Sequence, residues 1–123
     1  MIPLLFIFGI LIGALGGIFM KIGATSIGPI EISSFEQLLA FFFKLITSVQ
    51  SVVGVALYFI SAIIWFYLLT KLDISFVQPI LALTYVVTPI LAIIFLGEHV
   101  SAFRWAGILI IIVGVFVVAK SST

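Results

Sequence analysis

Polar side chains recur inside one long, uncharged and apolar run of this sequence, residues 74–97. If the run is a helix, with about 100° between successive residues, one face carries Ser75, Gln78, Ala82, Tyr85 and Pro89, with Thr88 beside them. Hydroxyl and amide groups facing lipid would lack hydrogen-bond partners, so this stripe should face protein or water. Two interpretations stay open. The stripe forms hydrogen bonds between helices, worth about 1 kcal/mol each, or it forms the polar wall of a substrate path.

The same run contains two prolines, Pro79 and Pro89. Proline has no N–H, so each one frees the carbonyl one turn earlier, near Ser75 and Tyr85, and weakens the helix there. The sequence therefore predicts a bend in this helix, which would serve as a static kink or as a hinge.

A second polar face lies in the preceding apolar stretch, where Tyr58, Ser61 and Trp65 share one side of a helix. Trp65 and Tyr67 are near the end of that stretch, where aromatic residues commonly mark the membrane surface. Tyr58 is deeper and is the better candidate for lining a pocket.

Charged side chains lie only outside or at the borders of the apolar stretches. Acidic residues inside membrane helices mark proton relays and cation sites. None is found in these stretches, so no residue is available to couple proton movement to cation exchange.

With one histidine and no cysteine, no metal site or cofactor attachment is expected. No acid–base or nucleophile–base set can be assembled within the membrane, which argues against an enzyme. The net charge of +1 gives no reason to propose nucleic acid as a partner.

Two cations are placed to meet an anion at the rims of the spans. Arg104 follows Glu98 and His99 in an interfacial cluster, and Lys21 ends the first apolar stretch. The cluster is either a solvated turn or a gate in which Arg104 contacts a phosphate. Ser101 is expected to cap the last helix.

The composition places the chain in a bilayer. It is 65% hydrophobic and 7% charged, whereas soluble domains are about half apolar and a quarter charged. Four charge-free stretches cover residues 1–20, 45–70, 74–97 and 105–119; a helical span needs about 20 apolar residues, and Phe103 extends the last. We predict one all-α domain, residues 1–123, with four transmembrane helices in the inner cell membrane.

Small residues recur along the first stretch. Gly9, Gly13 and Gly17 form two overlapping small-xxx-small steps, which let membrane helices approach closely. Tight helix packing is one interpretation. The other is that the smooth face lines a cavity and makes room for a substrate.

The one long connection covers residues 23–48. Gly28 and Pro29 mark a turn, and Ser33 or Ser34 followed by Glu36 is typical of a helix start. Apolar residues at helical spacing then predict an interfacial helix over residues 34–46. The alternative is that these residues are the first turns of a longer second span.

Orientation is weakly specified. With four spans both termini lie on one side, together with Lys71 and Lys120, while Lys21, Lys44 and Arg104 lie on the other. Either five charges are too few to judge, or copies insert both ways up. Dual insertion would allow an antiparallel pair, the inverted repeat common in transporters.

The sequence resembles the drug/metabolite transporter superfamily, and most of all its four-helix members. "GGIFMKIGAT" ends the first helix with Gly16 and Lys21 at family-typical positions, and the segment from "FISAIIWFYLL" to "GEHVS" resembles the EamA signature. "RWAGILIIIVGVFVV" resembles the last helix, where Gly107 and Gly114 match a glycine pair that packs dimers in small multidrug resistance proteins. The resemblance covers nearly the whole chain except residues 27–49.

One departure affects the expected substrate. Gly13 stands where small multidrug resistance proteins carry an essential glutamate, eight residues before the lysine, which argues against drug–proton antiport of that type. The paired subunits of the aminoarabinose-lipid flippase also lack the acid and are similar in the first and third helices. The resemblance therefore favours lipid-linked or amphipathic substrates, such as a polyprenyl-phosphate sugar.

The combined prediction is a transporter that works by alternating access as a homodimer, or as a heterodimer with a related small subunit. Gly13 and Gly17 would leave room for the substrate in the cavity. Tyr58, Gln78 and Tyr85 would line the cavity with hydrogen-bonding groups. Lys21 and Arg104 would hold an anionic head group at the rims. The rivals are an exporter of small metabolites or cationic drugs and an accessory subunit that transports nothing.

Overall fold

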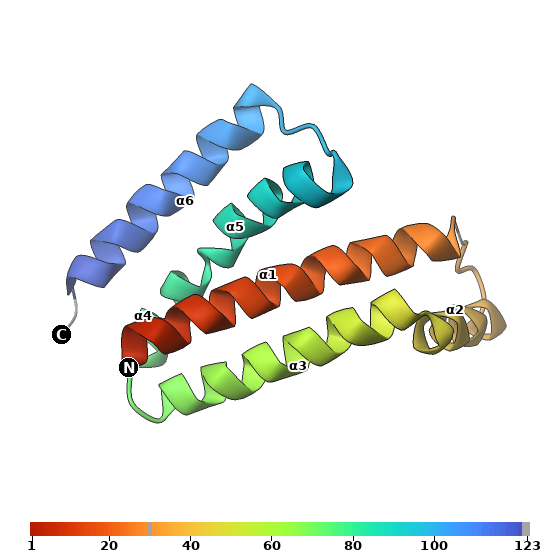
Figure 1. Cartoon of the computed structure of the whole chain (residues 1–123), viewed down its shortest axis with the longest axis horizontal. Helices are drawn as coiled ribbons and strands as arrows, with labels where there is room; N and C mark the ends of the chain where they lie inside the picture. The colour runs from red at the N-terminus through yellow and green to blue at the C-terminus, as the bar shows by residue number, and fades with distance from the viewer. Residues whose placement is uncertain (30, 122–123) are drawn as a thin grey trace.

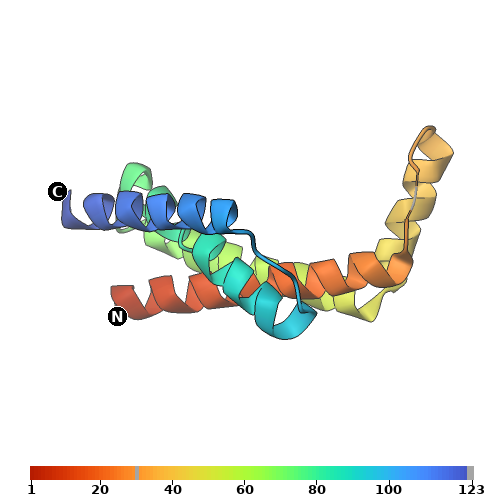
Figure 2. The same cartoon turned by 90° about the horizontal axis from the view of Figure 1, so that it is seen from above.

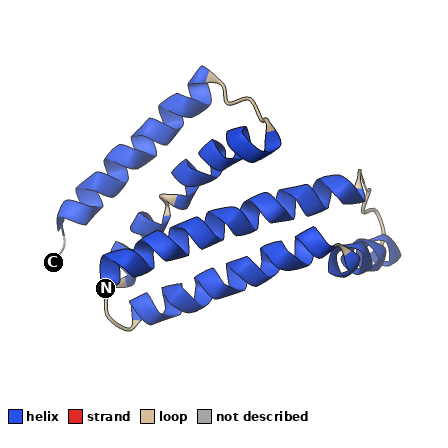
Figure 3. Ribbon diagram, viewed as in Figure 1, coloured by secondary structure: helices blue, strands red, loops and turns tan. Residues whose placement is uncertain are grey.

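The computed structural model describes residues 1–29 and 31–121. Within these residues the chain is helical with short connections, as Figure 3 shows. The helices are α1 (Ile2–Ile27), α2 (Phe35–Thr47), α3 (Val49–Leu69), α4 (Ile74–Leu81), α5 (Thr84–Leu91), the π-helical turn η1 (Ala92–Leu96) and α6 (Ala102–Ser121). Four spans are long and apolar enough to cross a membrane: α1, α3, the run Ile74–Leu96, and α6. The chain is an all-α membrane protein, as predicted.

The four spans lie in a row rather than around a common centre. α1 packs along α3 on one side and against α5 on the other, and α6 packs against α4 and α5. Figure 1 shows α3 and α6 at the two outer edges, and Figure 2 shows how shallow the assembly of spans is when seen from above. Broad faces of the spans are therefore left uncovered by the chain itself.

The buried core lies at the end of the bundle where both termini are found. Phe6, Leu68, Val77, Ile80 and Val115 form one buried cluster drawn from α1, α3, α4 and α6. Phe6 also meets Phe76 edge to face, with ring centroids 6.4 Å apart, an arrangement that aromatic pairs prefer. From this end the arm made of α5 and α6 diverges from the α1–α3 pair (Figure 1).

The third span is broken, which confirms the predicted bend. The break falls at Ala82 and Leu83, between the two prolines rather than beside the carbonyls that they free. There the backbone tightens to bonds between residues three apart: the Ala82 N–H reaches the Pro79 carbonyl at 3.0 Å and the Tyr85 N–H reaches the Ala82 carbonyl at 2.9 Å. The span then widens into η1 and ends at Gly97, whose φ of 65° suits glycine.

The predicted interfacial helix is a separate element. Ser34 caps α2 by accepting the Gln37 N–H at 3.3 Å, and the Ser33 N–H and hydroxyl donate to Gln37 Oε1 at 2.7 and 2.8 Å. Gln37, and not the Glu36 noted in the sequence, therefore exchanges the capping hydrogen bonds with the two serines. Ser48 is extended and separates α2 from α3, so α2 is not the start of a longer span. α2 runs crosswise to α1 and α3 (Figure 2), with no buried residue and a strongly apolar face, as a helix lying on a membrane would.

Candidate functional site

The small-residue face of α1 packs against α3. At Gly16 an added Cβ would lie 2.9 Å from the Gly54 carbonyl oxygen, and at Gly54 it would lie 2.8 Å from the Gly16 carbonyl oxygen and the Met20 nitrogen. The two backbones thus approach too closely for a side chain at either position. In lipid the apolar surroundings give helices little reason to associate, so close backbone contact supplies the attraction.

Gly13 and Gly17 lie along the same contact, opposite the polar face of α3. An added Cβ at Gly13 would lie 3.1 Å from Ser61 Oγ, and one at Gly17 would lie 3.4 Å from the Tyr58 hydroxyl. The Ser61 hydroxyl donates to the Gly9 carbonyl at 2.9 Å. The structure therefore brings Gly13, Gly17 and Tyr58 together, with the volume of the missing side chains occupied by Ser61 and Tyr58.

Tyr58 is only partly used by this contact. Its side chain is 44% exposed, and among the described residues no hydrogen bond is formed by its hydroxyl, which lies over Gly17. The hydroxyl therefore lies near the middle of the α1–α3 pair without a hydrogen-bond partner in the described chain.

The polar stripe of the third span faces away from the core. Val77 and Ile80 are buried in the core cluster, whereas Ser75, Gln78 and Tyr85 are exposed. Tyr85 is 68% exposed and lies just after the break in the span. Within the described chain neither the Gln78 amide nor the Tyr85 hydroxyl makes a hydrogen bond.

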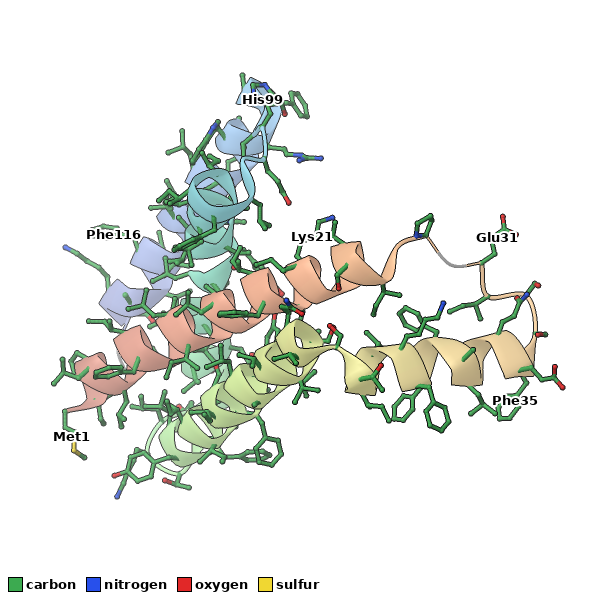
Figure 4. The ribbon with its side chains drawn as sticks, turned by 45° about the vertical axis from the view of Figure 1, so that its right-hand side comes forward. Met1, Lys21, Glu31, Phe35, His99 and Phe116 are labelled. Carbon is green, nitrogen blue, oxygen red and sulfur yellow. The ribbon has the colours of Figure 1, made fainter. Side chains whose placement is uncertain are left out.

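The two predicted rim cations are exposed and lie on different arms. The Lys21 side chain points away from α2 and α3 in Figure 4, while His99 marks the far turn between η1 and α6. Arg104 follows that turn, in the first turn of α6, where its backbone N–H donates to Ser101 Oγ at 3.2 Å. Ser101 is thus the predicted cap. No salt bridge joins Lys21 or Arg104 to an acidic residue in the described chain, so both charges are available to an anion.

The predicted dimer contact is open in the single chain. Gly107 and Gly114 are exposed on α6, and an added Cβ at either one would meet nothing within 4 Å. The two glycines therefore contribute nothing to packing within one chain.

The sequence reading missed two residues of the α1–α3 contact, Gly54 and Ser51. Ser51 is 3% exposed and its side chain fills the space beside Gly23. A glycine within an otherwise bulky span was the available signal for Gly54. Ser51 had no signal, because its burial depends on how α1 is positioned against the start of α3.

Comparison with known proteins agrees with this architecture. The sequence profile described as the EamA-like transporter family matches residues 1–120. No curated protein matches the chain, and no solved structure does. The match covers all four apolar spans, including the broken third span. The chain belongs to the EamA-like transporter family, a family of multi-pass membrane transporters.

Proposed function

We propose that the chain acts as a dimer that moves an amphipathic, anionic substrate across the membrane by alternating access, and that the substrate is a lipid-linked one such as a polyprenyl-phosphate sugar. The substrate path would run along Tyr58, Gln78 and Tyr85. Lys21 and Arg104 would receive the anionic head at the rims.

The observation that carries the proposal is the exposed tyrosine in the middle of the third span. The Tyr85 hydroxyl has no hydrogen-bond partner in the described chain, and its side chain is 68% exposed. A polar group facing hydrocarbon is costly, so it should meet protein or a water-filled path. A second copy, or a substrate held between two copies, would supply that partner.

The charges and the break in the third span support the kind of transport proposed. The four spans carry no acidic residue at depth, and the exposed cations Lys21 and Arg104 stand at span ends without a salt bridge in the described chain, which suits an anionic head rather than a cationic drug. The break at Ala82 and Leu83, just before Tyr85, divides the span into two helical segments. Discontinuous helices at the binding site are a recurring feature of transporters.

The test is a flipping assay on the purified chain in phospholipid vesicles, with a fluorescent short-chain polyprenyl phosphate as the probe. Tyr85→Phe removes one hydroxyl and should slow flipping by about tenfold to a hundredfold, because a hydrogen bond to a charged group is worth about 1.5–3 kcal/mol. Tyr67→Phe is the matched control, since Tyr67 lies at the end of α3 with Lys71 Nζ 6.0 Å from its ring centroid.

Chemical crosslinking of the same samples reports the dimer. Slow flipping with an intact dimer would favour a path through Tyr85, whereas loss of the dimer would assign Tyr85 to packing. Wild-type vesicles that flip no faster than protein-free vesicles, despite an intact homodimer, would contradict the proposal for this chain alone and point to an accessory role.

A further inference from the structure

A large apolar cavity lies where α2 meets the α1–α3 pair. Its volume is about 580 Å³, and its lining includes Met20, Ala24, Phe42, Leu45, Ser51 and Val55. This volume is within the range of about 300–1,000 Å³ that is usual for ligand pockets. The cavity is partly open, and its walls come from three helices.

One polar atom in this lining lacks a partner. Ser51 is 3% exposed, and its Oγ makes no hydrogen bond within the described chain. The Oγ is packed against Gly23 and has almost no exposed surface, so it does not face the cavity. The rest of the named lining is apolar, so the cavity suits a ligand segment that is itself apolar.

The position of the cavity indicates where such a ligand comes from. α2 is amphipathic and runs crosswise to the spans (Figure 2), so its apolar face lies at the boundary between head groups and acyl chains. The cavity is lined by the second half of α2, and Lys44 lies in the last turn of that helix. Lys21 is next to Met20 on α1, and both lysines are exposed. An acidic residue, Glu36, lies at the opposite end of α2.

We infer that this cavity binds one acyl chain of a phospholipid from the surrounding bilayer. The acyl chain lies against Met20, Leu45 and Val55, and the phosphate lies at the level of Lys21 and Lys44. This site is separate from the stripe of Gln78 and Tyr85, and the inference does not rest on the proposed transport function.

The first test needs only the wild-type chain in phosphatidylcholine vesicles. A phosphatidylcholine with a photoreactive group in its acyl chain is added in rising proportion, and the labelled peptides are quantified by mass spectrometry. A binding site should give saturable labelling of peptides from α2 and the start of α3, while labelling of the exposed face of α6 rises in proportion to the probe. Proportional labelling at both places would overturn the inference.

Variants then place the lipid in the cavity. Ala24→Trp fills it and should lower the saturable labelling about tenfold, whereas Ala56→Trp, on the exposed side of α3, should leave it unchanged. Ser51→Ala removes a hydroxyl that does not face the cavity, and should leave the saturation unchanged as well. If saturable labelling persists unchanged in Ala24→Trp, the lipid lies elsewhere and the assignment fails.

Discussion

Single glycines determine how closely the first two spans approach. The sequence predicted the small-residue face of α1, because the repeat is visible along one helix. It did not show which glycines are indispensable, since that depends on the partner backbone. The structure separates them: Gly16 and Gly54 meet backbone atoms, whereas Gly17 meets the movable end of Tyr58.

We expect Gly54→Ala to destabilise the protein. The added Cβ would lie 2.6 Å from Met20 Cγ and 2.8 Å from backbone atoms of α1, so the two helices must separate. Overpacking of this kind costs about 1–3 kcal/mol. Unfolding in detergent, followed by circular dichroism, should show the loss.

Gly17→Ala is the matched control on the same contact. Its Cβ would lie 3.4 Å from the Tyr58 hydroxyl, an ordinary contact, and alanine is the better helix former by about 1 kcal/mol. Equal destabilisation by both changes would mean that the α1–α3 backbones are not as close as the structure places them.

At the scale of elements, the sequence predicted every span and the surface helix, but not the site of the break. Proline spacing indicates that the third span bends. The tightened turn at Ala82 and Leu83 lies between α4, which is part of the core, and α5, which packs against α1, and proline spacing alone does not show where these contacts fall. The separation of α2 from α3 likewise rests on the extended backbone at Ser48, which residue spacing alone does not reveal.

Replacing Pro79 should tighten the third span. Pro79→Ala restores an N–H that can reach the Ser75 carbonyl and removes the clash of the ring, a change worth about 3 kcal/mol in a helix interior. Hydrogen exchange of the peptide around Ala82 to Tyr85 should slow by about tenfold or more, and transport should fall if the break acts as a hinge.

Pro3→Ala provides the comparison, because Pro3 lies in the first turn of α1 where its N–H would have no helical partner. Unchanged exchange around Tyr85 in Pro79→Ala would show that the break is imposed by packing and not by the proline.

At the scale of the whole molecule, a single row of spans leaves much of the chain uncovered, and the candidate site is incomplete. The structure brings together Gly13, Gly17 and Tyr58. By contrast, the side chains of Gln78 and Tyr85 face outward. The two cations, Lys21 and Arg104, lie on separate arms. The sequence named these residues by type and depth. It could not show that one chain leaves them apart, because the arrangement depends on how α5 crosses α1.

If two copies associate through α6, as we propose, its exposed glycines have a packing role. Gly114→Leu should weaken self-association about tenfold or more, because close approach of two α6 helices needs a small residue there. Ala119→Leu, near the end of the same helix, is the control. Energy transfer between labelled copies in vesicles measures the change. An unaltered dimer in Gly114→Leu would move the interface to another face.

The near balance of lysine and arginine on the two sides predicts that copies insert in both orientations. The chain has no cysteine, so Ser121→Cys and His99→Cys place single thiols at opposite ends of α6. An impermeant thiol reagent applied to intact cells should label about half of the copies of each variant, since each orientation exposes one end. Complete labelling of one variant and none of the other would establish a fixed orientation. An antiparallel homodimer would then be impossible, and an antiparallel transporter would need a different partner inserted the other way.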